Sequence, residues 1–249
     1  MSRTPNSSPE VPAGTPLAGQ TALITGASRG IGLSIARRVA RLGAAVGLCG
    51  RDRRPLDAAA DLLRRTGVRV HAETADVSRA SDVASLVAHT EAALGPIDIL
   101  VNNAGIGIFG PAHERSEADW DAVLDTNLKG AFLVSRAVVS SMIRRHTGHI
   151  VNISSLAGKN VFAGGGIYCA SKWGLQGLSG CMAEDLRAYG IRVSLVCPGS
   201  VATDSSPHVG RDPGKLLQPD DVGHAVAMLL TQSPTSFISE VQLRPVQKP

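Results

Sequence analysis

The sequence predicts an α/β domain in which a doubly wound parallel sheet of about seven strands carries helices on both faces. Short apolar runs alternate with segments that are long enough for a helix. The runs are apolar on both strand faces, which is typical of parallel strands covered from both sides. Right-handed crossovers then produce the doubly wound arrangement. The expected strands are residues 21–25, 44–49, 69–74, 97–102, 149–154, 191–197 and 238–243.

The length of the chain favours one domain. Its 249 residues are 43% hydrophobic, which is enough to bury one substantial core. Residues 1–16 are rich in Pro, Ser, Gly and Thr, so we expect a disordered N-terminal tail there and a single catalytic domain over residues 17–249. The start of the chain lacks the apolar core of a signal peptide, and no apolar run reaches the roughly 18 residues that span a bilayer. We therefore expect a cytoplasmic protein without a membrane partner.

Charge and cysteine content narrow the function classes further. The 25 Lys and Arg residues exceed the 21 Asp and Glu residues by four, and they are scattered along the chain. This scatter leaves no basic tract that would bind nucleic acid. Only 3% of the residues are aromatic, so no surface for stacking of nucleic-acid bases is expected either. The four cysteines form no CxxC pair, and Cys49 and Cys197 lie inside expected strands. Buried thiols in a reducing compartment fit this pattern best.

A glycine-rich loop follows the first expected strand and leads into an expected helix. Residues 25–32 read TGASRGIG. Gly26 suits a tight turn, Gly30 lets a diphosphate approach the backbone, and Gly32 allows close packing of helix and strand. The free N–H groups at the start of the helix then face an anion. An ordinary turn is the alternative, but the strand before the loop and the helix after it favour dinucleotide binding.

The end of the second expected strand indicates which dinucleotide is preferred. An acidic residue at this point binds the free ribose 2′-hydroxyl of NAD, whereas Gly50 stands there in this chain and Arg51 follows it. Arg29 in the glycine loop is expected beside the same ribose. Two charge-assisted contacts to a 2′-phosphate favour NADPH over NADH. The alternative is that both arginines face solvent, and Asp52 lowers the local positive charge.

Three further segments complete a pattern with the glycine loop. NNAG occupies residues 102–105 after the fourth expected strand, SSLAG occupies 154–158 after the fifth, and YCASK occupies 168–172 in the next expected helix. In this order and spacing, the four segments resemble the short-chain dehydrogenase/reductase family, and the 3-oxoacyl-(acyl carrier protein) reductases within it. The resemblance runs from about residue 17 to residue 243. It implies a Rossmann-type fold and an NAD(P)-dependent oxidoreductase.

Tyr168 and Lys172 are four positions apart and share one face of the expected helix. A phenol with a pKa of about 10 exchanges its proton slowly at neutral pH. An ammonium group about 4 to 5 Å away supplies about 3 to 4 kcal/mol at an effective dielectric constant of about 20. We therefore expect Lys172 to lower the pKa of Tyr168 toward neutrality, so that Tyr168 acts as the general acid.

The resemblance also implies roles for residues that match the family's motifs. Ser155, thirteen residues before Tyr168, is the expected partner of the substrate carbonyl, and Asn127 is expected to anchor a water molecule that links the lysine to solvent. Asn102 is expected to join strands. The catalytic set is Asn127, Ser155, Tyr168 and Lys172. The expected cofactor-binding set is Gly26, Ser28, Arg29, Gly30, Ile31, Gly32, Arg51, Asp76, Val77, Asn103, Ala104, Gly105, Tyr168, Lys172, Pro198, Gly199, Val201 and Thr203.

The chain departs from the family pattern at its C-terminus. Many members carry a GG pair after the last strand, which this chain lacks, so the oligomer contacts and the floor of the pocket stay open. Residues 204–221, where the family builds its substrate lid, are short and polar. Arg211 and Lys215 in this segment are expected to be surface charges, with binding of an anionic substrate as the alternative. His208 and the other histidines show no metal-ligand spacing, so no metal is expected.

The function that these observations predict is reduction of a ketone with NADPH, with hydride transfer from the nicotinamide and a proton from Tyr168. A 3-oxoacyl thioester is one candidate substrate. The alternatives are an NAD(P)-dependent secondary-alcohol dehydrogenase and a non-catalytic sensor or scaffold that binds the cofactor. The sensor or scaffold would be expected to have lost Ser155, Tyr168 or Lys172, and all three are present. By resemblance, we also expect a homodimer or homotetramer.

Overall fold

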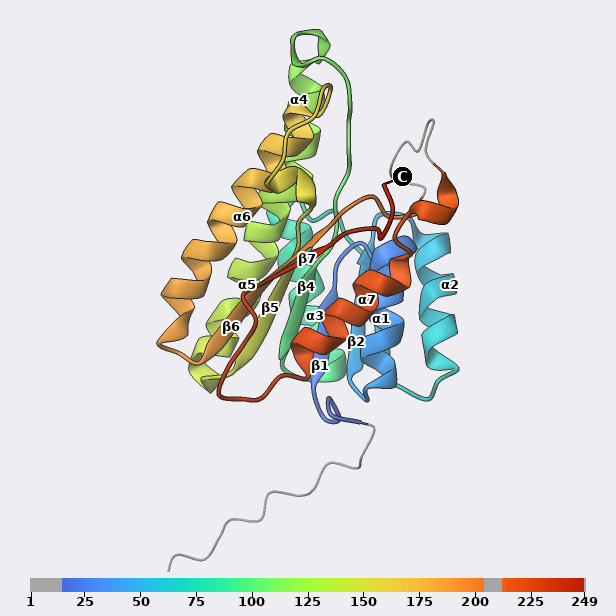
Figure 1. The fold of residues 1–249 in the computed structure, drawn as a ribbon. Coiled ribbons are helices and arrows are strands. Elements are labelled where there is room, and N and C mark those ends of the chain that lie inside the picture. Colours follow the sequence, from blue (N-terminus) through green and yellow to red (C-terminus); the bar gives the residue numbers. More distant parts are fainter. Residues whose placement is uncertain (1–14, 204–211, 249) are drawn as a thin grey trace, which may run out of the picture.

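The computed structural model describes residues 15–203 and 212–248. Its centre is a seven-stranded sheet in the order β3-β2-β1-β4-β5-β6-β7, and every pair of neighbouring strands is parallel (Figure 1). All seven expected strands are confirmed. They are β1 (Thr21–Ile24), β2 (Ala45–Gly50), β3 (Val70–Thr74), β4 (Ile99–Asn102), β5 (Gly148–Ile153), β6 (Ile191–Pro198) and β7 (Glu240–Leu243).

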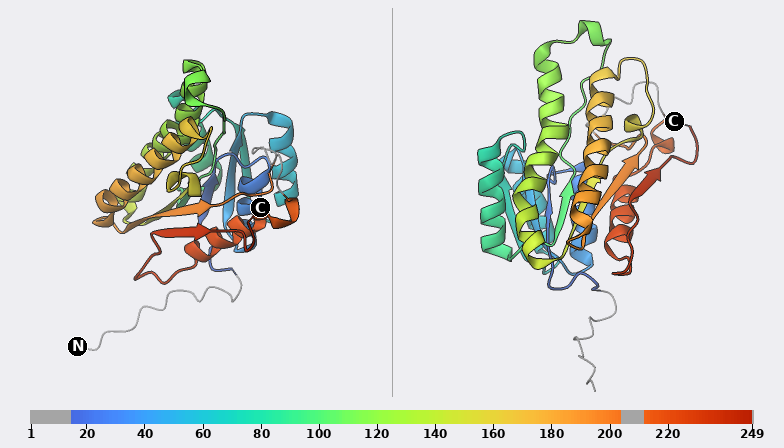
Figure 2. Two further views of the ribbon diagram at one scale, coloured as in Figure 1. Left: turned by 45° about the horizontal axis from the view of Figure 1, so that its top comes forward. Right: turned by 90° about the vertical axis from the view of Figure 1, so that its left-hand side faces the viewer.

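Helices cover both faces of the sheet, as expected (Figure 2). On one face lie α1 (Gly30–Arg41), α2 (Arg53–Arg64) and α7 (Pro219–Leu230). On the other face lie α3 (Ala80–Leu94), α5 (Gly130–Arg145) and α6 (Gly166–Arg187). The remaining elements are α4 (Glu117–Leu124), the 3-10 turns η1 (Ala112–Glu114), η3 (Leu156–Gly158) and η4 (Pro213–Lys215), and the π-helical turn η2 (Asp125–Lys129). No helix in the described ranges is long and apolar enough to cross a membrane.

The period of two along each strand divides the core between the two faces. In β1, Ala22 and Ile24 pack against α1 and α7, whereas Leu23 packs with the cluster under α3 and α5. The three side chains are fully buried. Burial on both faces stabilises the parallel sheet, at about 25 cal/mol for each Å² of apolar surface removed from water.

Local sequence signals set several helix boundaries. Ser116 and Asp119 form a reciprocal capping box that starts α4. Pro219 begins α7, where the missing N–H group of proline costs nothing. Gly95 follows the last residue of α3 with a positive φ of 96°. These signals start and stop the helices so that the connections reach the ends of the strands.

The first described residues already belong to the folded domain. The carbonyl of Thr15 accepts a hydrogen bond from Ala18 N at 3.0 Å, and Leu17 N donates to Leu42 O at 2.9 Å. These bonds place residues 15–18 against the end of α1, at the expected start of the domain. Most of the expected tail, residues 1–14, lies outside the described residues.

The order of the strands creates a crevice beside β1. The chain builds the sheet outward from β1 to β3 and then crosses to β4 on the other side of β1. Ligands of doubly wound sheets bind at such a switch point, outside the carboxyl ends of the strands. α4 rises above this edge of the sheet (Figure 1).

Candidate active site

A cavity of about 1120 Å³ opens along the carboxyl ends of the strands. Loops that follow β1, β2, β3, β4, β5 and β6 line it, although these loops are far apart in the sequence. All expected site residues except Ser28 and Asn127 lie in its wall. The fold thus brings these separate segments of the chain to one concave surface, which is the usual form of a small-molecule site.

The glycine loop between β1 and α1 depends on its glycines. Gly26 and Gly30 have positive φ angles of 63° and 56°, a region that other residues rarely adopt. A Cβ on Gly32 would lie 2.3 Å from the carbonyl oxygen of Gly26, so only hydrogen fits there. The start of α1 therefore comes close to the cavity, where its free N–H groups suit an anionic diphosphate.

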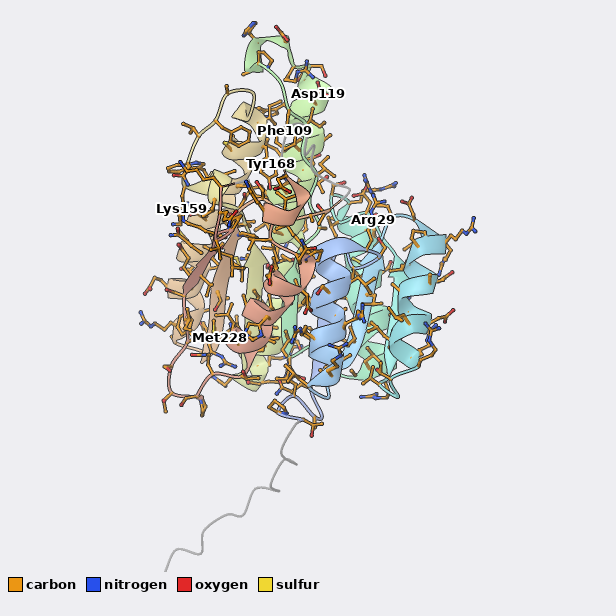
Figure 3. All side chains as sticks on the ribbon, turned by 45° about the vertical axis from the view of Figure 1, so that its right-hand side comes forward. Arg29, Phe109, Asp119, Lys159, Tyr168 and Met228 are labelled. Carbon is orange, nitrogen blue, oxygen red and sulfur yellow. The ribbon has the colours of Figure 1, made fainter. Side chains whose placement is uncertain are left out.

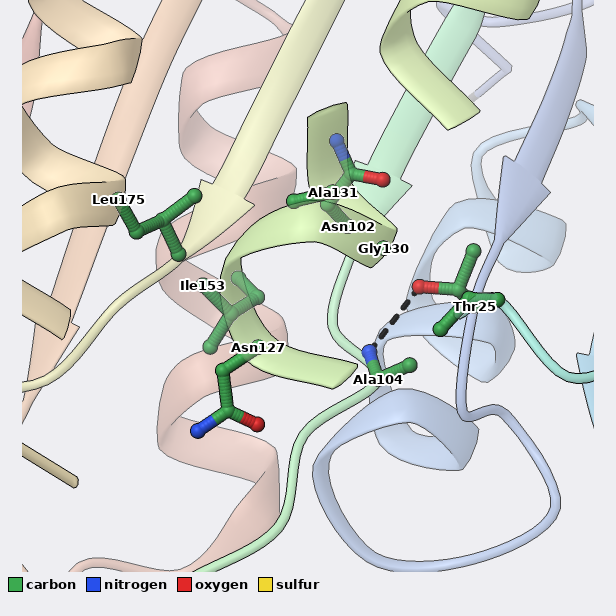
Figure 4. A pocket seen from close by; sticks show the side chains of 9 residues that line it. Thr25, Asn102, Ala104, Asn127, Gly130, Ala131, Ile153 and Leu175 are labelled. Carbon is green, nitrogen blue, oxygen red and sulfur yellow. Dashed lines mark hydrogen bonds between the residues drawn. The ribbon is translucent and has the colours of Figure 1, made fainter. Parts of the chain in front are cut away.

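Thr25 and Asn103 hold this loop against the segment after β4. Thr25 Oγ1 accepts hydrogen bonds from the N–H groups of Asn103 and Ala104, both at 3.0 Å. Figure 4 shows the bond from Ala104. In return, Asn103 Nδ2 donates to the carbonyls of Thr25 at 2.9 Å and Gly26 at 3.1 Å. This reciprocal set of bonds fixes the floor of the cavity before any ligand arrives.

Arg29 and Arg51 line one end of the cavity, next to the end of β2. Arg29 precedes the first residue of α1, and its side chain is labelled in Figure 3. Gly50, which ends β2, contributes no carboxylate there. Ser28 lies behind Gly50, since a Cβ on that glycine would be 3.3 Å from Ser28 Oγ. The positive charge at this end is therefore not balanced by an acidic residue at position 50.

Asp76 lies at the same end of the cavity. Burial raises its pKa, but hydrogen bonds from Ser78 and the positive charges of Arg51 and Arg79 outweigh burial and hold the pKa below its ordinary value. Ser78 Oγ donates to Asp76 Oδ1 at 2.7 Å. The Asp76 carboxylate is thus an oriented acceptor at neutral pH, suited to an amine or hydroxyl group.

The other end of the cavity is lined by Tyr168, Lys172 and Ser155. Lys172 Nζ lies 5.7 Å from the centroid of the Tyr168 ring and donates to the carbonyl of Ile153 at 3.0 Å. Ser155 forms the N-cap of η3, where its Oγ accepts from Ala157 N at 3.0 Å. Ser155 Oγ donates to Pro198 O at 3.5 Å, and the interaction of Ser155 with Tyr168 lowers the pKa of that phenol. Two hydroxyl groups and an ammonium group therefore face one part of the cavity.

The expected pKa of Tyr168 is wrong. Burial raises this pKa above its ordinary value, and the hydrogen bond from Ser155 offsets burial only in part. Burial also lowers the pKa of Lys172 to about 8. The physical reason is that both side chains are desolvated and the Lys172 ammonium is directed at the Ile153 carbonyl, so its field does not dominate at the phenol.

Comparison with known proteins identifies the family. A family model described as short chain dehydrogenase matches residues 20–213. The chain belongs to the short-chain dehydrogenase family. Members are oxidoreductases that act on alcohol and carbonyl groups, so the expected enzyme class is confirmed.

Relatives of this short-chain dehydrogenase cover nearly its whole length. The 2-(S)-hydroxypropyl-CoM dehydrogenase 3 of Xanthobacter autotrophicus is 37% identical over 84% of this chain and 88% of that protein. A metagenomic short-chain oxidoreductase in complex with NADP is 46% identical, with a TM-score of 0.83 over 94% of this chain and 100% of the other. The alcohol dehydrogenase of Thermococcus sibiricus complexed with 5-hydroxy-NADP is 33% identical, with a TM-score of 0.85 over 92% and 98%.

Asn127 lies behind the catalytic end of this short-chain dehydrogenase. Its Oδ1 accepts from Ile106 N at 2.8 Å, and its Nδ2 donates to Ile106 O at 2.9 Å and to Ser171 Oγ at 3.0 Å. The residue is in η2, which interrupts the run from α4 to α5 with a π-helical turn, a feature frequent at functional sites. Because both amide hydrogens are used within the protein, the Asn127 side chain positions α6 and the loop after β4.

Asn102 joins strands, as expected. Its Nδ2 donates to Asn152 Oδ1 in β5 at 2.8 Å and to Ser135 Oγ in α5 at 2.9 Å. All three residues are buried. The bonds tie β4 to β5 directly beneath the site.

The loop after β6 closes the catalytic end of the cavity. Gly199 N donates to the carbonyl of Leu243 in β7 at 2.8 Å. Val201 forms an isolated bridge with Leu217. A Cβ on Gly30 would lie 3.5 Å from Thr203 Cγ2, so Thr203 stands over the glycine loop. Four of the expected cofactor-binding residues thus line the cavity from this loop: Pro198, Gly199, Val201 and Thr203.

Sequence reasoning missed two groups of residues in the cavity wall. One is apolar and includes Phe109, whose ring centroid is 5.4 Å from that of Tyr168 and 6.1 Å from that of Phe162 (Figure 3). The other is the C-terminal segment 244–248, of which Arg244, Pro245, Gln247 and Lys248 line the cavity. The missing GG pair was the only sequence signal that pointed to this segment.

The expected lid is only partly described. Arg211 and His208 lie outside the described residues. Lys215, in η4, forms an ion pair with Asp212 at 3.9 Å and is not part of the cavity wall. Among the described residues, no group of three His, Cys, Asp or Glu side chains is arranged to hold a metal ion.

Proposed function

We propose that this short-chain dehydrogenase is an NADPH-dependent carbonyl reductase. The observation that carries the proposal is the convergence of Ser155, Tyr168 and Lys172 at one end of the cavity, while the glycine loop and two arginines line it elsewhere. Solved relatives in complex with NADP or 5-hydroxy-NADP support this choice of cofactor. The remaining expected cofactor-binding residues, apart from Ser28, also line the cavity.

Arg29 and Arg51 are the residues that we propose bind the 2′-phosphate of NADPH. Each guanidinium group can form charge-assisted hydrogen bonds with a phosphate, and such bonds are worth about 1.5 to 3 kcal/mol before solvent screening reduces them. Gly50 offers no carboxylate to repel the phosphate or to bind a free ribose hydroxyl. The residues present therefore fit NADPH better than NADH.

In the proposed mechanism, the bound nicotinamide supplies the hydride, and the chain positions the carbonyl and supplies the proton. Ser155 Oγ donates a hydrogen bond to the substrate oxygen and holds it beside the Tyr168 hydroxyl. Tyr168 then donates its proton to that oxygen. Its raised pKa keeps the phenol protonated at neutral pH, which suits reduction better than the alternative of alcohol oxidation, where a phenolate must accept the proton.

Lys172 is the group that restores the proton in this scheme. With a pKa of about 8, it is charged in most molecules at neutral pH and can return a proton through a short path. Its hydrogen bond to the Ile153 carbonyl holds the ammonium below the Tyr168 ring. The same ammonium group is placed to bind ribose hydroxyls of the nicotinamide half.

The test is reduction of a panel of ketones, including a 3-oxoacyl thioester, followed by the loss of NADPH absorbance. Tyr168→Phe keeps the ring and removes the proton donor, so we expect kcat to fall by about 10² to 10⁴ with little change in NADPH affinity. Ser155→Ala serves as the second variant and should lower kcat by a smaller factor. Turnover that survives Tyr168→Phe would overturn the mechanism.

We also propose a homo-oligomer that forms through α4, α5 and α6. These neighbouring helices carry three large exposed side chains, Trp120, Phe132 and Trp173, which are 48%, 42% and 52% exposed. Sedimentation velocity tests this proposal. Trp173→Ser should shift the protein toward the monomer, whereas Met228→Ser, which removes an exposed apolar side chain from α7, should not. Identical sedimentation of both variants would count against the interface.

We propose a cytoplasmic location on the basis of the thiols. All four cysteines are unpaired, and Cys49, Cys169 and Cys197 are buried, whereas Cys181 is exposed on α6. Burial raises the pKa of Cys49 to about 12 and that of Cys197 to about 11, so neither thiol is reactive at neutral pH. Unpaired cysteines fit a reducing compartment.

A further inference from the structure

The segment that follows β7 forms part of the cavity wall at the catalytic end. The carbonyl of Leu243, the last residue of β7, accepts from Gly199 N at 2.8 Å. A Cβ on Gly199 would lie 3.1 Å from Pro245 Cδ and 3.4 Å from Leu156 Cδ1. Leu156 directly follows the catalytic Ser155. Pro245 therefore lies beside the reacting end of the cavity, and its neighbours Arg244 and Lys248 line the same cavity.

Positive charge dominates the described wall of this cavity. Its basic residues are Arg29, Arg51, Lys172, Arg244 and Lys248, and its acidic residue is Asp76. Arg29 and Arg51 are assigned to the proposed 2′-phosphate, and Lys172 is assigned to the proposed proton transfer. Arg244 and Lys248 remain, and the proposed chemistry of hydride and proton transfer does not use them.

These two cations have no acidic partner within the described ranges of the chain. Arg244 Nη2 donates to the neutral Gln242 Oε1 at 3.4 Å. The nearby carboxylate of Glu240 is engaged by Lys159, with Nζ and Oε2 at 2.8 Å. A bound anion would therefore find both charges available, since neither is neutralised by an ion pair among the described residues.

The same end of the cavity also offers apolar surface. Phe109 lies against Tyr168 and Phe162, and all three line the cavity. Phe162 is 48% exposed and its neighbour Val161 is 80% exposed, which leaves apolar surface uncovered at the rim. Burial of such surface by a ligand is favourable at about 25 cal/mol for each Å². The wall thus offers an aromatic surface and a cationic surface to one molecule.

We infer that the substrate is a carbonyl compound with an apolar or aromatic body and an anionic group, and that Arg244 and Lys248 select for that anion. The inference rests on the proposed function, because it names the substrate class of the same site. Arg244 offers a planar fork of donors that matches a carboxylate, and Lys248 adds a mobile ammonium group. The two residues are specificity determinants, and the carbonyl chemistry stays with Ser155 and Tyr168.

The experiment measures binding apart from turnover. Tyr168→Phe protein loaded with NADP⁺ is titrated calorimetrically with β-benzoylpropionate and with its methyl ester, in which a neutral methyl ester replaces the carboxylate. Arg244→Ala/Lys248→Ala removes both cations from the segment after β7 and is called the tail variant. The control variant is Arg65→Ala/Arg144→Ala, which removes two exposed charges outside the cavity wall, one directly after α2 and one in α5.

The expected result is that the acid binds about tenfold more tightly than the ester, that the tail variant removes this preference, and that the control variant keeps it. Equal affinities for acid and ester, or a preference that survives in the tail variant, would overturn the inference. The inference would also be overturned if the tail variant lost NADP⁺ affinity by the same factor as it lost affinity for the acid. Arg244 and Lys248 would then bind the cofactor and not the substrate. Binding of the acid without reduction of any ketone by the wild-type enzyme would instead contradict the proposed function.

Discussion

At the scale of single residues, Lys172 and Tyr168 illustrate how burial changes the chemistry of a motif. Desolvation disfavours the charged form of both groups, so the pKa of the lysine falls to about 8 and that of the phenol rises. The hydrogen bond from Ser155 acts against this rise. These two shifts keep the proton on the phenol and let the lysine release one more readily, as the proposed carbonyl reduction requires.

The proposed preference for NADPH over NADH also rests on single side chains. In Gly50→Asp/Arg51→Ala, a carboxylate replaces a guanidinium group at the end of β2, and we expect the preference for NADPH over NADH to fall by at least about tenfold. The new Cβ would lie 3.3 Å from Ser28 Oγ, a contact that rotation of the serine can relieve. The measurement is kcat/KM with each dinucleotide. Arg53→Ala, on the first residue of α2, is the control, and an unchanged preference in the double variant would contradict the assignment.

At the scale of elements, the start of α1 and the interrupted helix around η2 place the ends of the site. α1 approaches the cavity only because Gly32 packs against the backbone of Gly26. The π-helical turn η2 directs Asn127 toward Ile106 and Ser171, and so couples the loop after β4 to α6. These contacts hold the glycine loop beside the end of β1, and they hold α6 beside the loop that follows β4.

Gly32→Ala should therefore disrupt the cofactor site. The added methyl group would lie 2.3 Å from Gly26 O and 2.5 Å from Asn103 Nδ2, so the glycine loop must shift. We expect at least about a tenfold loss of NADPH affinity, measured by fluorescence titration, and a lower melting temperature. Gly177→Ala on α6 is the matched control, because a Cβ there meets no atom within 4 Å and alanine favours the helix by about 1 kcal/mol. Equal NADPH affinity in the two variants would refute the proposed packing role.

At the scale of the whole molecule, the parallel sheet gathers distant segments at one edge and buries polar groups in its interior. His149 in β5 is 1% exposed, and its Nε2 lies 2.9 Å from Ser194 Oγ in β6. Ser194 donates its own hydrogen to Ile238 O at 2.7 Å, so the hydroxyl accepts from a neutral His149. The bond joins β5, which leads into Ser155, to β6, which ends at Pro198.

This histidine makes the stability of the fold depend on pH. Burial, with the charge of Arg192, lowers the pKa of His149 to about 3, whereas the unfolded chain has a pKa of about 6.5. The unfolded state therefore binds the proton first, and the stabilisation that is fully present above pH 6.5 is lost as the pH falls toward 3. Urea unfolding should give a free energy about 2 kcal/mol lower at pH 5 than at pH 7 from this group. His149→Gln, which does not titrate, should lose that part of the dependence, and an identical pH profile would disprove the assignment.

Local sequence patterns were sufficient for the elements and for much of the site. Apolar runs such as residues 191–197 identify buried strands because a parallel strand must be apolar on both faces. The spacing of Tyr168 and Lys172 places both on one side of α6 because a helix repeats every 3.6 residues. The family resemblance likewise predicted that Asn102 links strands, and its bond to Asn152 provides that link.

What the sequence by itself determined is therefore the sheet, the helices and the chemical groups of the site, since these depend on short-range periodicity and on residue type. Tertiary structure alone decided the pKa values of Tyr168 and Lys172, because desolvation depends on everything packed around a group. It also decided that residues 244–248 line the cavity beside Leu156. That approach joins parts of the chain almost ninety positions apart, and no local pattern encodes such a distance.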